Sequence, residues 1–212
     1  MDTCIVLAKE PLAGRVKTRL SPGFTPDQAA ELAAAALRDT LSAVEQVPAR
    51  RRLLAFDGPT AAWAPAGWRT TRQPAGGLDV RLAAAFEAAG AGNAVLVGMD
   101  TPQLHASQLA AFDPARFDAC LGLARDGGYW TLGLRDIRLA GAAIIGVPMS
   151  CSDTGARQRE RLVALGLRVQ LLDELVDVDT PADAYDVAER APHTGFARAL
   201  SRLRPGIAQD AG

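Results

Sequence analysis

Short apolar runs without alternating polar residues constrain the fold of this chain more than any other feature. In the stretch Ala94–Gly98 (AVLVG) every residue is apolar or glycine, which is typical of a parallel strand covered on both faces. Similar runs recur along the chain with helical patterns between several of them, so the sequence predicts an α/β protein with three layers. The other runs cover Thr3–Ala8, Arg52–Phe56, Trp68–Thr71, Ala119–Leu123, Tyr129–Leu134 and Leu167–Leu172.

The helix with the clearest start signal is expected from about Pro26 to Val47. Thr25 is a candidate N-cap, Pro26 suits the first helical position, and Gln28 completes a capping-box pattern. Further helices are expected over Leu82–Ala89, Ala156–Leu165, Ala182–Arg190 and Ala197–Leu203.

Length and composition fit a single globular unit. The chain has 212 residues, of which 49% are hydrophobic and 22% charged, enough for one well-buried core. We expect one domain over residues 1–204 and a flexible tail over 205–212. The formal net charge of -1 argues against a sequence-independent nucleic-acid binder, which needs a surplus of basic residues to displace counterions. No nucleic-acid partner is therefore expected.

The cysteines and the N-terminus bear on the compartment. Cys4, Cys120 and Cys151 show no paired spacing, so neither a disulfide framework nor a zinc site is indicated. The N-terminus lacks a basic region followed by an apolar segment, and no apolar run approaches the ~20 residues of a membrane span. We expect a cytoplasmic protein with no membrane partner.

A cationic loop follows the first strand-like run. Lys9, Arg15, Lys17 and Arg19 occupy it, and Gly14 lets a ligand approach the backbone closely. An open parallel sheet binds ligands beyond the carboxyl ends of its strands, and these cations suit phosphate oxygens. The loop has neither the Walker A nor the GxGxxG spacing. Spacing alone leaves two interpretations open, a polyphosphate site and a solvated basic surface loop.

Two aspartates lie where a divalent cation could be held. Asp100 follows the run Ala94–Gly98 after Met99, and Asp179 precedes Thr180 near the end of the chain. Magnesium usually takes one or two protein carboxylates and completes its shell with water and substrate phosphates. Helix capping is the alternative for both aspartates. The two roles are compatible if Thr180 is the cap and Asp179 the metal ligand.

Asp126, Gly127 and Gly128 make a turn-like sequence between two strand-like runs. One interpretation is a plain β-hairpin. In the other, the glycines let the backbone approach a substrate that Asp126, Tyr129 or Trp130 recognises. Ser/His/Asp hydrolysis has little support because no nucleophile elbow is present, and Cys151 has no located base.

Four stretches in this order, KEPLAGRVKTRL, GMDTPQL, DGGYWTLGL and DVDTPADA, resemble the DUF2064 family. Its members are also called radical-SAM/selenodomain-associated transferases, and the family belongs to the nucleotide-diphospho-sugar transferase superfamily with the GT-A fold. The resemblance extends from about Thr3 to Ala191. It implies a mixed, mostly parallel sheet of about seven strands in a Rossmann-like sandwich, with a nucleotide above the strand ends.

The resemblance also implies roles for individual residues. Lys17 and Arg19 would be catalytic, Asp100 and Asp179 would bind Mg²⁺ or Mn²⁺, and the stretch from Asp126 to Tyr129, with Gly127 and Gly128, would face the acceptor. The nucleotide would be bound by Ala8, Lys9, Gly14, Arg15, Lys17, Gln73 and Arg81.

Two stretches depart from the family pattern. The family's QxxGDLGxRL appears as QPAGGLDVRL, which keeps Gln73 and Arg81 but places Gly77 and Asp79 where aspartate and glycine are usual. The family's WST appears as the stretch Met149–Cys151. These departures concern a segment for the base or ribose and a loop on the acceptor side.

The sequence thus predicts a magnesium-dependent transferase that joins part of a nucleotide-activated donor to a small-molecule acceptor. A loop this cationic favours nucleotidyl transfer from a nucleoside triphosphate, because pyrophosphate must leave. The residues before Asp100 also lack the Asp-x-Asp pattern of metal-dependent glycosyltransferases. Glycosyl transfer from a nucleotide sugar, a non-catalytic nucleotide-binding regulator and a homodimeric state all stay open.

Overall fold

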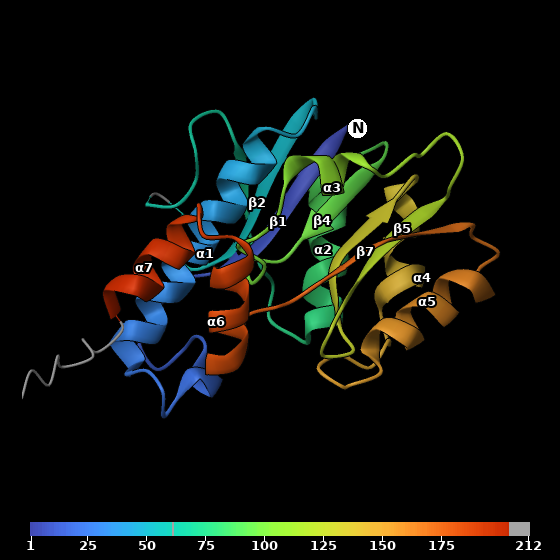
Figure 1. Ribbon diagram of the computed structural model, residues 1–212. Coiled ribbons are helices and arrows are strands. Elements are labelled where there is room, and N and C mark those ends of the chain that lie inside the picture. Colours follow the sequence, from blue (N-terminus) through green and yellow to red (C-terminus); the bar gives the residue numbers. More distant parts are fainter. Residues whose placement is uncertain (61, 204–212) are drawn as a thin grey trace, which may run out of the picture.

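The computed structural model describes residues 1–60 and 62–203. Within these residues seven strands form one sheet in the order β3-β2-β1-β4-β6-β5-β7 (Figure 1). Strand β6 is antiparallel to β4 and β5, whereas the other neighbours are parallel. The predicted α/β class with a mixed, mostly parallel sheet is therefore confirmed. The strands are β1 (Thr3–Lys9), β2 (Arg51–Asp57), β3 (Arg69–Arg72), β4 (Ala94–Val97), β5 (Ala119–Ala124), β6 (Tyr129–Leu134) and β7 (Val169–Leu175).

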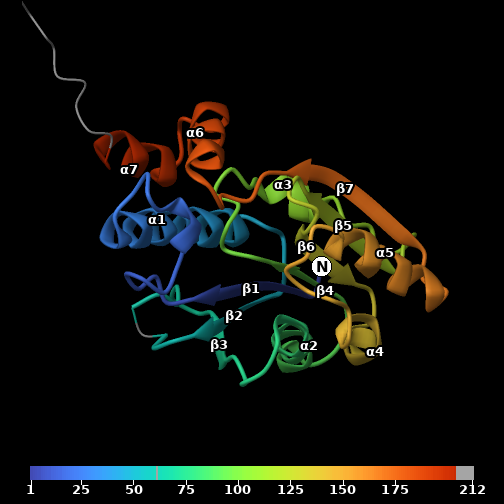
Figure 2. The ribbon, with the colours of Figure 1, turned by 90° about the horizontal axis from the view of Figure 1, so that it is seen from below.

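Helices cover both faces of the sheet and make the three layers that were expected. Figure 2 shows α1, α6 and α7 on one side and α2 and α4 on the other. Successive side chains of β1 point to opposite faces of the sheet. Val6 lies in the buried apolar cluster that contains Leu37, and Ile5 lies in the buried apolar cluster that contains Phe86. The helices are α1 (Pro26–Glu45), α2 (Leu78–Ala89), α3 (Ala106–Ala110), α4 (Ala140–Ile144), α5 (Thr154–Ala164), α6 (Pro181–Arg190) and α7 (Gly195–Leu203).

Local sequence signals explain the starts of two long helices. In α1 the Thr25 hydroxyl accepts a hydrogen bond from the Gln28 backbone N–H at 3.2 Å, and the Gln28 side chain accepts one from the Thr25 N–H at 2.9 Å. The predicted capping box is thus present. Helix α2 begins at Leu78, four positions before the expected start at Leu82, because Gly77 and the short turn before it take over the role of the N-cap.

The carboxyl ends of β1, β4, β5 and β7 lie along one edge of the sheet, where β6 begins. The Val178 N–H donates to the Asp100 carbonyl at 3.0 Å and joins the segment after β7 to the end of β4. Val176 and Val178 are buried against α1 and α6 in a third apolar cluster. Residues alternate in an extended segment, so this burial turns Asp177 and Asp179 toward the edge of the sheet.

None of the helices in the described part of the chain combines the length and apolar character that a membrane crossing needs. The predicted flexible tail over 205–212 lies outside the described residues.

Candidate active site

Lys17 is held between two carboxylates at the edge of the sheet. Its Nζ lies 2.7 Å from Asp100 Oδ1 and 3.2 Å from Asp179 Oδ1, and its side chain is only 8% exposed. Burial by itself would lower the pKa of Lys17, but the charges of Asp100 and Asp179 hold this pKa above its ordinary value. The ammonium is therefore charged at neutral pH.

The backbone of Lys17 is also unusual. With φ of 50° and ψ of 38° it is left-handed, directly before the 3-10 helix Thr18–Leu20. Among the described residues, Lys17 and Ser150 are the only non-glycine residues with a positive φ. Both line the cavities beside this edge of the sheet. Such strained backbone conformations persist only where several surrounding contacts hold them in place, and they concentrate at functional sites.

Asp179 and Thr180 have separate roles. Arg19 Nη1 lies 3.4 Å from Asp179 Oδ2, so this carboxylate faces both cations of the loop. Thr180 is the N-cap of α6, and its hydroxyl accepts a hydrogen bond from the Asp183 N–H at 3.3 Å. The sequence left capping and ligand binding open at this point, and in the structure the cap is Thr180.

Asp100 does not cap a helix either. The next helix, α3, begins at Ala106 with His105 as its N-cap. The Asp100 side chain is 43% exposed, so it can reach both Lys17 and a ligand. Capping, the alternative interpretation of the sequence, is therefore wrong for this residue.

Two adjoining cavities open at this point and share Arg19, Met99, Asp100 and Asp179 in their walls. The smaller, of about 170 Å³, contains the cationic side of the site, because Lys9 and Lys17 also line it. The larger, of about 510 Å³, extends over the ends of β4, β5 and β6. Its other lining residues include Leu7, Leu78, Leu82, Leu96, Asp126, Gly128, Tyr129, Cys151 and Asp177.

The turn from Asp126 to Gly128 is a β-hairpin between β5 and β6, and it also lines the larger cavity. Gly127 has φ of +89°, and a Cβ there would overlap the Ser152 carbonyl. Its own carbonyl accepts a hydrogen bond from the Gly155 N–H at 2.8 Å, which fixes the hairpin on the start of α5. The hairpin interpretation is therefore confirmed, and recognition of an acceptor at this turn stays a prediction.

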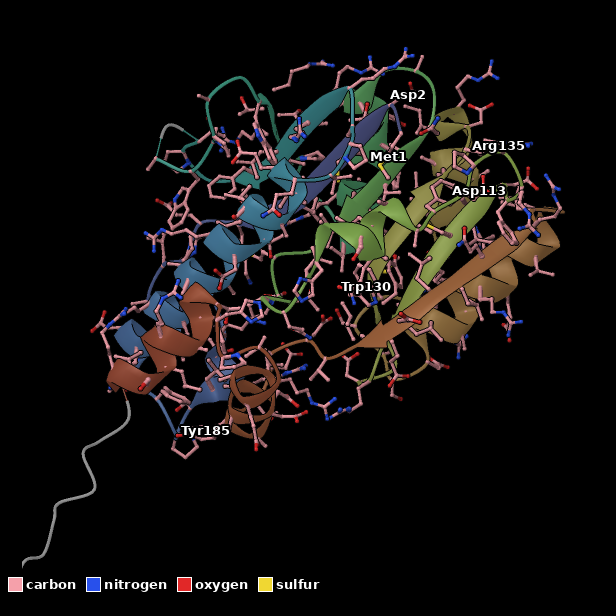
Figure 3. The ribbon with its side chains drawn as sticks, turned by 45° about the horizontal axis from the view of Figure 1, so that its top comes forward. Met1, Asp2, Asp113, Trp130, Arg135 and Tyr185 are labelled. Atoms are coloured by element: carbon pink, nitrogen blue, oxygen red, sulfur yellow. The ribbon has the colours of Figure 1, made fainter. Side chains whose placement is uncertain are left out.

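The residue after Tyr129 secures the base of the same hairpin. Trp130, labelled in Figure 3, donates its indole N–H to the Asp173 carbonyl of β7 at 3.1 Å. Its ring packs where a Cβ on Gly122 would otherwise be. Tyr129 itself is held by the buried Gln158, whose Oε1 lies 3.4 Å from the tyrosine hydroxyl. The wall around Asp126 and Tyr129 is therefore set by buried contacts.

Asp177 is a cavity residue to which the sequence interpretation gave no role. Its Oδ1 is buried and has no hydrogen-bond partner among the described residues. Burial, and then the charge of Asp100, raise the pKa of Asp177 to about 7, although Lys17 opposes them. The signal for this residue was the spacing Asp-x-Asp, which puts Asp177 and Asp179 on the same side of an extended segment.

We expect Asp177→Asn to stabilise the protein at pH 8 but not at pH 4. The folded state holds the Asp177 proton up to about pH 7, whereas an unfolded aspartate releases it near pH 4. Stability is thus lost as the pH rises through this window. The asparagine variant avoids this loss, which is up to about 4 kcal/mol because the two pKa values differ by about three units. Denaturant unfolding with a chelator at both pH values measures this. A gain that is equal at both pH values would contradict it, and Asp173→Asn, on the exposed side of β7, is the control.

Five residues implied in nucleotide binding are not in the walls of either cavity: Ala8, Gly14, Arg15, Gln73 and Arg81. Gln73 donates its side-chain N–H groups to the carbonyls of Ala8 and Ala55, at 2.7 and 2.9 Å, and thereby ties β1 to β2. Arg81 forms a 3.3 Å ion pair with Asp57. Gly14 and Arg15 are exposed at the outer bend of the loop. The resemblance placed all five on the nucleotide, and that role stays a prediction.

The two departures from the family pattern both have structural consequences. Asp79 lies in the first turn of α2 and accepts a hydrogen bond from the Gly146 N–H at 2.9 Å, so it fastens α2 to the end of α4. This bond and one from Val80 hold the pKa of Asp79 below its usual range. The stretch Met149–Cys151 lines the larger cavity.

The donor set at the junction of the cavities fits a hard divalent cation. Asp100 and Asp179 supply carboxylate oxygens that converge on one point, which the Lys17 ammonium reaches. No group of three or more His, Cys, Asp or Glu side chains in residues 1–60 and 62–203 is placed to hold a metal ion. Two carboxylates with water and substrate phosphates are the usual environment of Mg²⁺, so the residues present suit that ion.

The fold and this edge of the sheet define an α/β protein of the nucleotide-diphospho-sugar transferase type. Residues 26–151, more than half of the chain, match the family described as "Uncharacterized protein conserved in bacteria (DUF2064)". The chain therefore belongs to the DUF2064 family. No curated protein sequence matches it.

Solved structures share the fold. A candidate nucleotide-diphospho-sugar transferase from Desulfovibrio desulfuricans G20 is 25% identical, with a TM-score of 0.84 over 95% of both chains. CMP:2-keto-3-deoxy-manno-octonic acid synthetase, solved with CTP, is 13% identical with a TM-score of 0.58 and covers 91% of this chain and 99% of its own. The Rv0371c protein of Mycobacterium tuberculosis H37Rv, solved with manganese, is 20% identical with a TM-score of 0.52 over 89% and 99%.

Proposed function

We propose that this protein is a nucleotidyltransferase that uses a nucleoside triphosphate, a small-molecule acceptor and Mg²⁺. The observation that carries the proposal is the meeting of Lys17 and Arg19 with Asp100 and Asp179 where the two cavities join. This arrangement puts cations and metal-binding carboxylates beside a space large enough for a donor and an acceptor.

The cationic side chains would act on the leaving group. Lys9, Lys17 and Arg19 line the smaller cavity, and negative charge accumulates on pyrophosphate as it leaves. Fixed cations at that place lower the barrier because they need no reorganisation during the reaction. A Mg²⁺ ion on Asp100 and Asp179 would neutralise further charge on the phosphates. The hairpin wall around Asp126 and Tyr129 would position the acceptor in the larger cavity.

Glycosyl transfer from a nucleotide sugar is the second candidate. The Desulfovibrio protein supports it through its description as a candidate nucleotide-diphospho-sugar transferase. The structure solved with CTP supports the triphosphate as donor, and so do the three cations of the smaller cavity. We also propose a cytoplasmic location, which the three free cysteines support.

A thermal-shift screen of the purified protein tests the donor. We expect a magnesium-dependent rise in Tm with one nucleoside triphosphate, because a ligand at ~100 times its Kd adds about 2.7 kcal/mol of stability. UDP-, GDP-, ADP- and CDP-sugars, each with and without Mg²⁺, form the comparison set. A rise confined to a nucleotide sugar would favour glycosyl transfer, and no rise with any nucleotide would count against both transferases.

A further inference from the structure

The larger cavity has a wall that differs in charge from the cationic loop. Asp126 and Asp177 lie in this wall, which we call the acidic wall. In the described part of the chain neither residue forms a salt bridge, and Asp177 Oδ1 has no hydrogen-bond partner. Arg19, the one lysine or arginine among the residues lining this cavity, is paired with Asp179 at 3.4 Å.

The helix N-termini at this cavity offer little to an anion. Helix α5 starts at Thr154, and its first N–H groups are used inside the protein: Thr154 donates to the Cys151 carbonyl at 3.1 Å and Gly155 to the Gly127 carbonyl at 2.8 Å. The first turn of α2 carries the Asp79 carboxylate. A helix N-terminus attracts anions through free N–H groups and its dipole, and in α5 internal acceptors already occupy the N–H groups of Thr154 and Gly155.

The cavity also has an apolar part, lined by Leu7, Leu78, Leu82 and Leu96. Side chains with hydroxyl groups, those of Thr131, Ser150, Ser152 and Thr154, line it as well. The carboxylate of Asp126 accepts hydrogen bonds, so a ligand beside it must donate them. Hydroxyl and amine groups can do this, whereas a phosphate or carboxylate group would bring a second negative charge against Asp126.

We propose that the acidic wall binds a hydroxyl- or amine-bearing acceptor that carries no phosphate or carboxylate group at this end. The inference rests on the proposed transferase function and names the chemical class of its acceptor. The anionic phosphates stay in the cationic cavity around Lys17, and the acceptor approaches from the opposite, acidic side.

Cys151 is a built-in probe of this wall. It is exposed and lines the larger cavity, whereas Cys4 and Cys120 are buried. We would compare its rates of modification by a trimethylammonium-ethyl and by a sulfonatoethyl methanethiosulfonate at low salt. Each rate is divided by the rate of the same reagent with 2-mercaptoethanol. The thiolate attacks the sulfur of both reagents and displaces methanesulfinate, so the thiolate fraction of Cys151 cancels in the ratio.

We expect the cationic reagent to be favoured by about tenfold, and less at high salt, where the charges are screened. Arg157 lies near Cys151, but its charge is paired with Asp153 at 2.7 Å. Asp126→Asn should lower the ratio several-fold while keeping its hydrogen bond from Gly128. Glu87→Gln, which removes the same charge from the exposed side of α2, should leave the ratio unchanged. Cys151→Ser identifies the modified residue.

A ratio of one, or a preference for the anionic reagent, would overturn the inference. The measurement needs no nucleotide, so it is independent of the donor screen. If a triphosphate raises Tm but Cys151 reacts preferentially with the anionic reagent, the transferase proposal holds and its acceptor belongs to another chemical class. If Cys151 reacts preferentially with the cationic reagent but no nucleotide binds, the inference about the acidic wall holds and the transferase proposal is wrong.

Discussion

Replacing Lys17 with methionine should lower transferase turnover by at least about a hundredfold, the effect expected when one fixed charge that stabilises a transition state is lost. The same change should destabilise the protein without metal. Asp100 and Asp179 then lose the ammonium that both contact, at 2.7 and 3.2 Å. Because these carboxylates are 43% and 32% exposed, we expect a cost of about 1–3 kcal/mol, below that of a fully buried pair.

Magnesium should reverse this loss of stability. In Lys17→Met a divalent cation can take the position of the ammonium between Asp100 and Asp179, so Mg²⁺ should raise Tm more in the variant than in the unchanged protein. The readout is thermal unfolding with MgCl₂ and with a chelator, in the absence of nucleotide.

Lys9→Met is the matched control for this test. Lys9 lines the same small cavity, and in the described residues it forms no ion pair. Its replacement removes an equal charge and should leave the response to Mg²⁺ unchanged. If Mg²⁺ raises Tm no more in Lys17→Met than in the unchanged protein, the ion does not take the position of the ammonium between Asp100 and Asp179.

Most of the fold was predictable because its elements carry local signals. The strand over Ala94–Gly98 is apolar throughout, and the capping box at Thr25 marks the start of α1. Two short helices, α3 and α4, were missed because five residues are too few to establish a helical period. The reversed direction of β6 was indicated by the hairpin interpretation of the turn from Asp126 to Gly128, because an apolar run by itself has the same pattern in both directions.

The candidate site was predictable where a residue follows the carboxyl end of a strand. Lys17, Arg19, Asp100 and Asp179 were each placed there by sequence order, and they meet in the structure. Hydrogen bonds between distant segments are not visible in the sequence. The bonds of Gln73 to β1 and β2 are of this kind.

Asp179→Asn should lower kcat by at least about a hundredfold and leave nucleotide binding much less affected. The carboxylate faces Lys17 and Arg19 beside the proposed metal position, where its charge matters most when the pyrophosphate leaves. Asparagine keeps the size of the side chain, and the cap at Thr180 does not depend on it. Pyrophosphate release measures turnover, and a thermal shift measures binding.

Asp186→Asn in α6 is the matched control, because it removes a carboxylate that pairs with Arg125 and Arg190 away from the cavities. It should keep full turnover. The experiment also separates an enzyme from a regulator. A regulator binds nucleotide and shows no turnover for Asp179→Asn to reduce, whereas a metal-dependent transferase loses its activity with this one carboxylate. If Asp179→Asn and Asp100→Asn both turn over at the unchanged rate, the two carboxylates do not hold the catalytic ion.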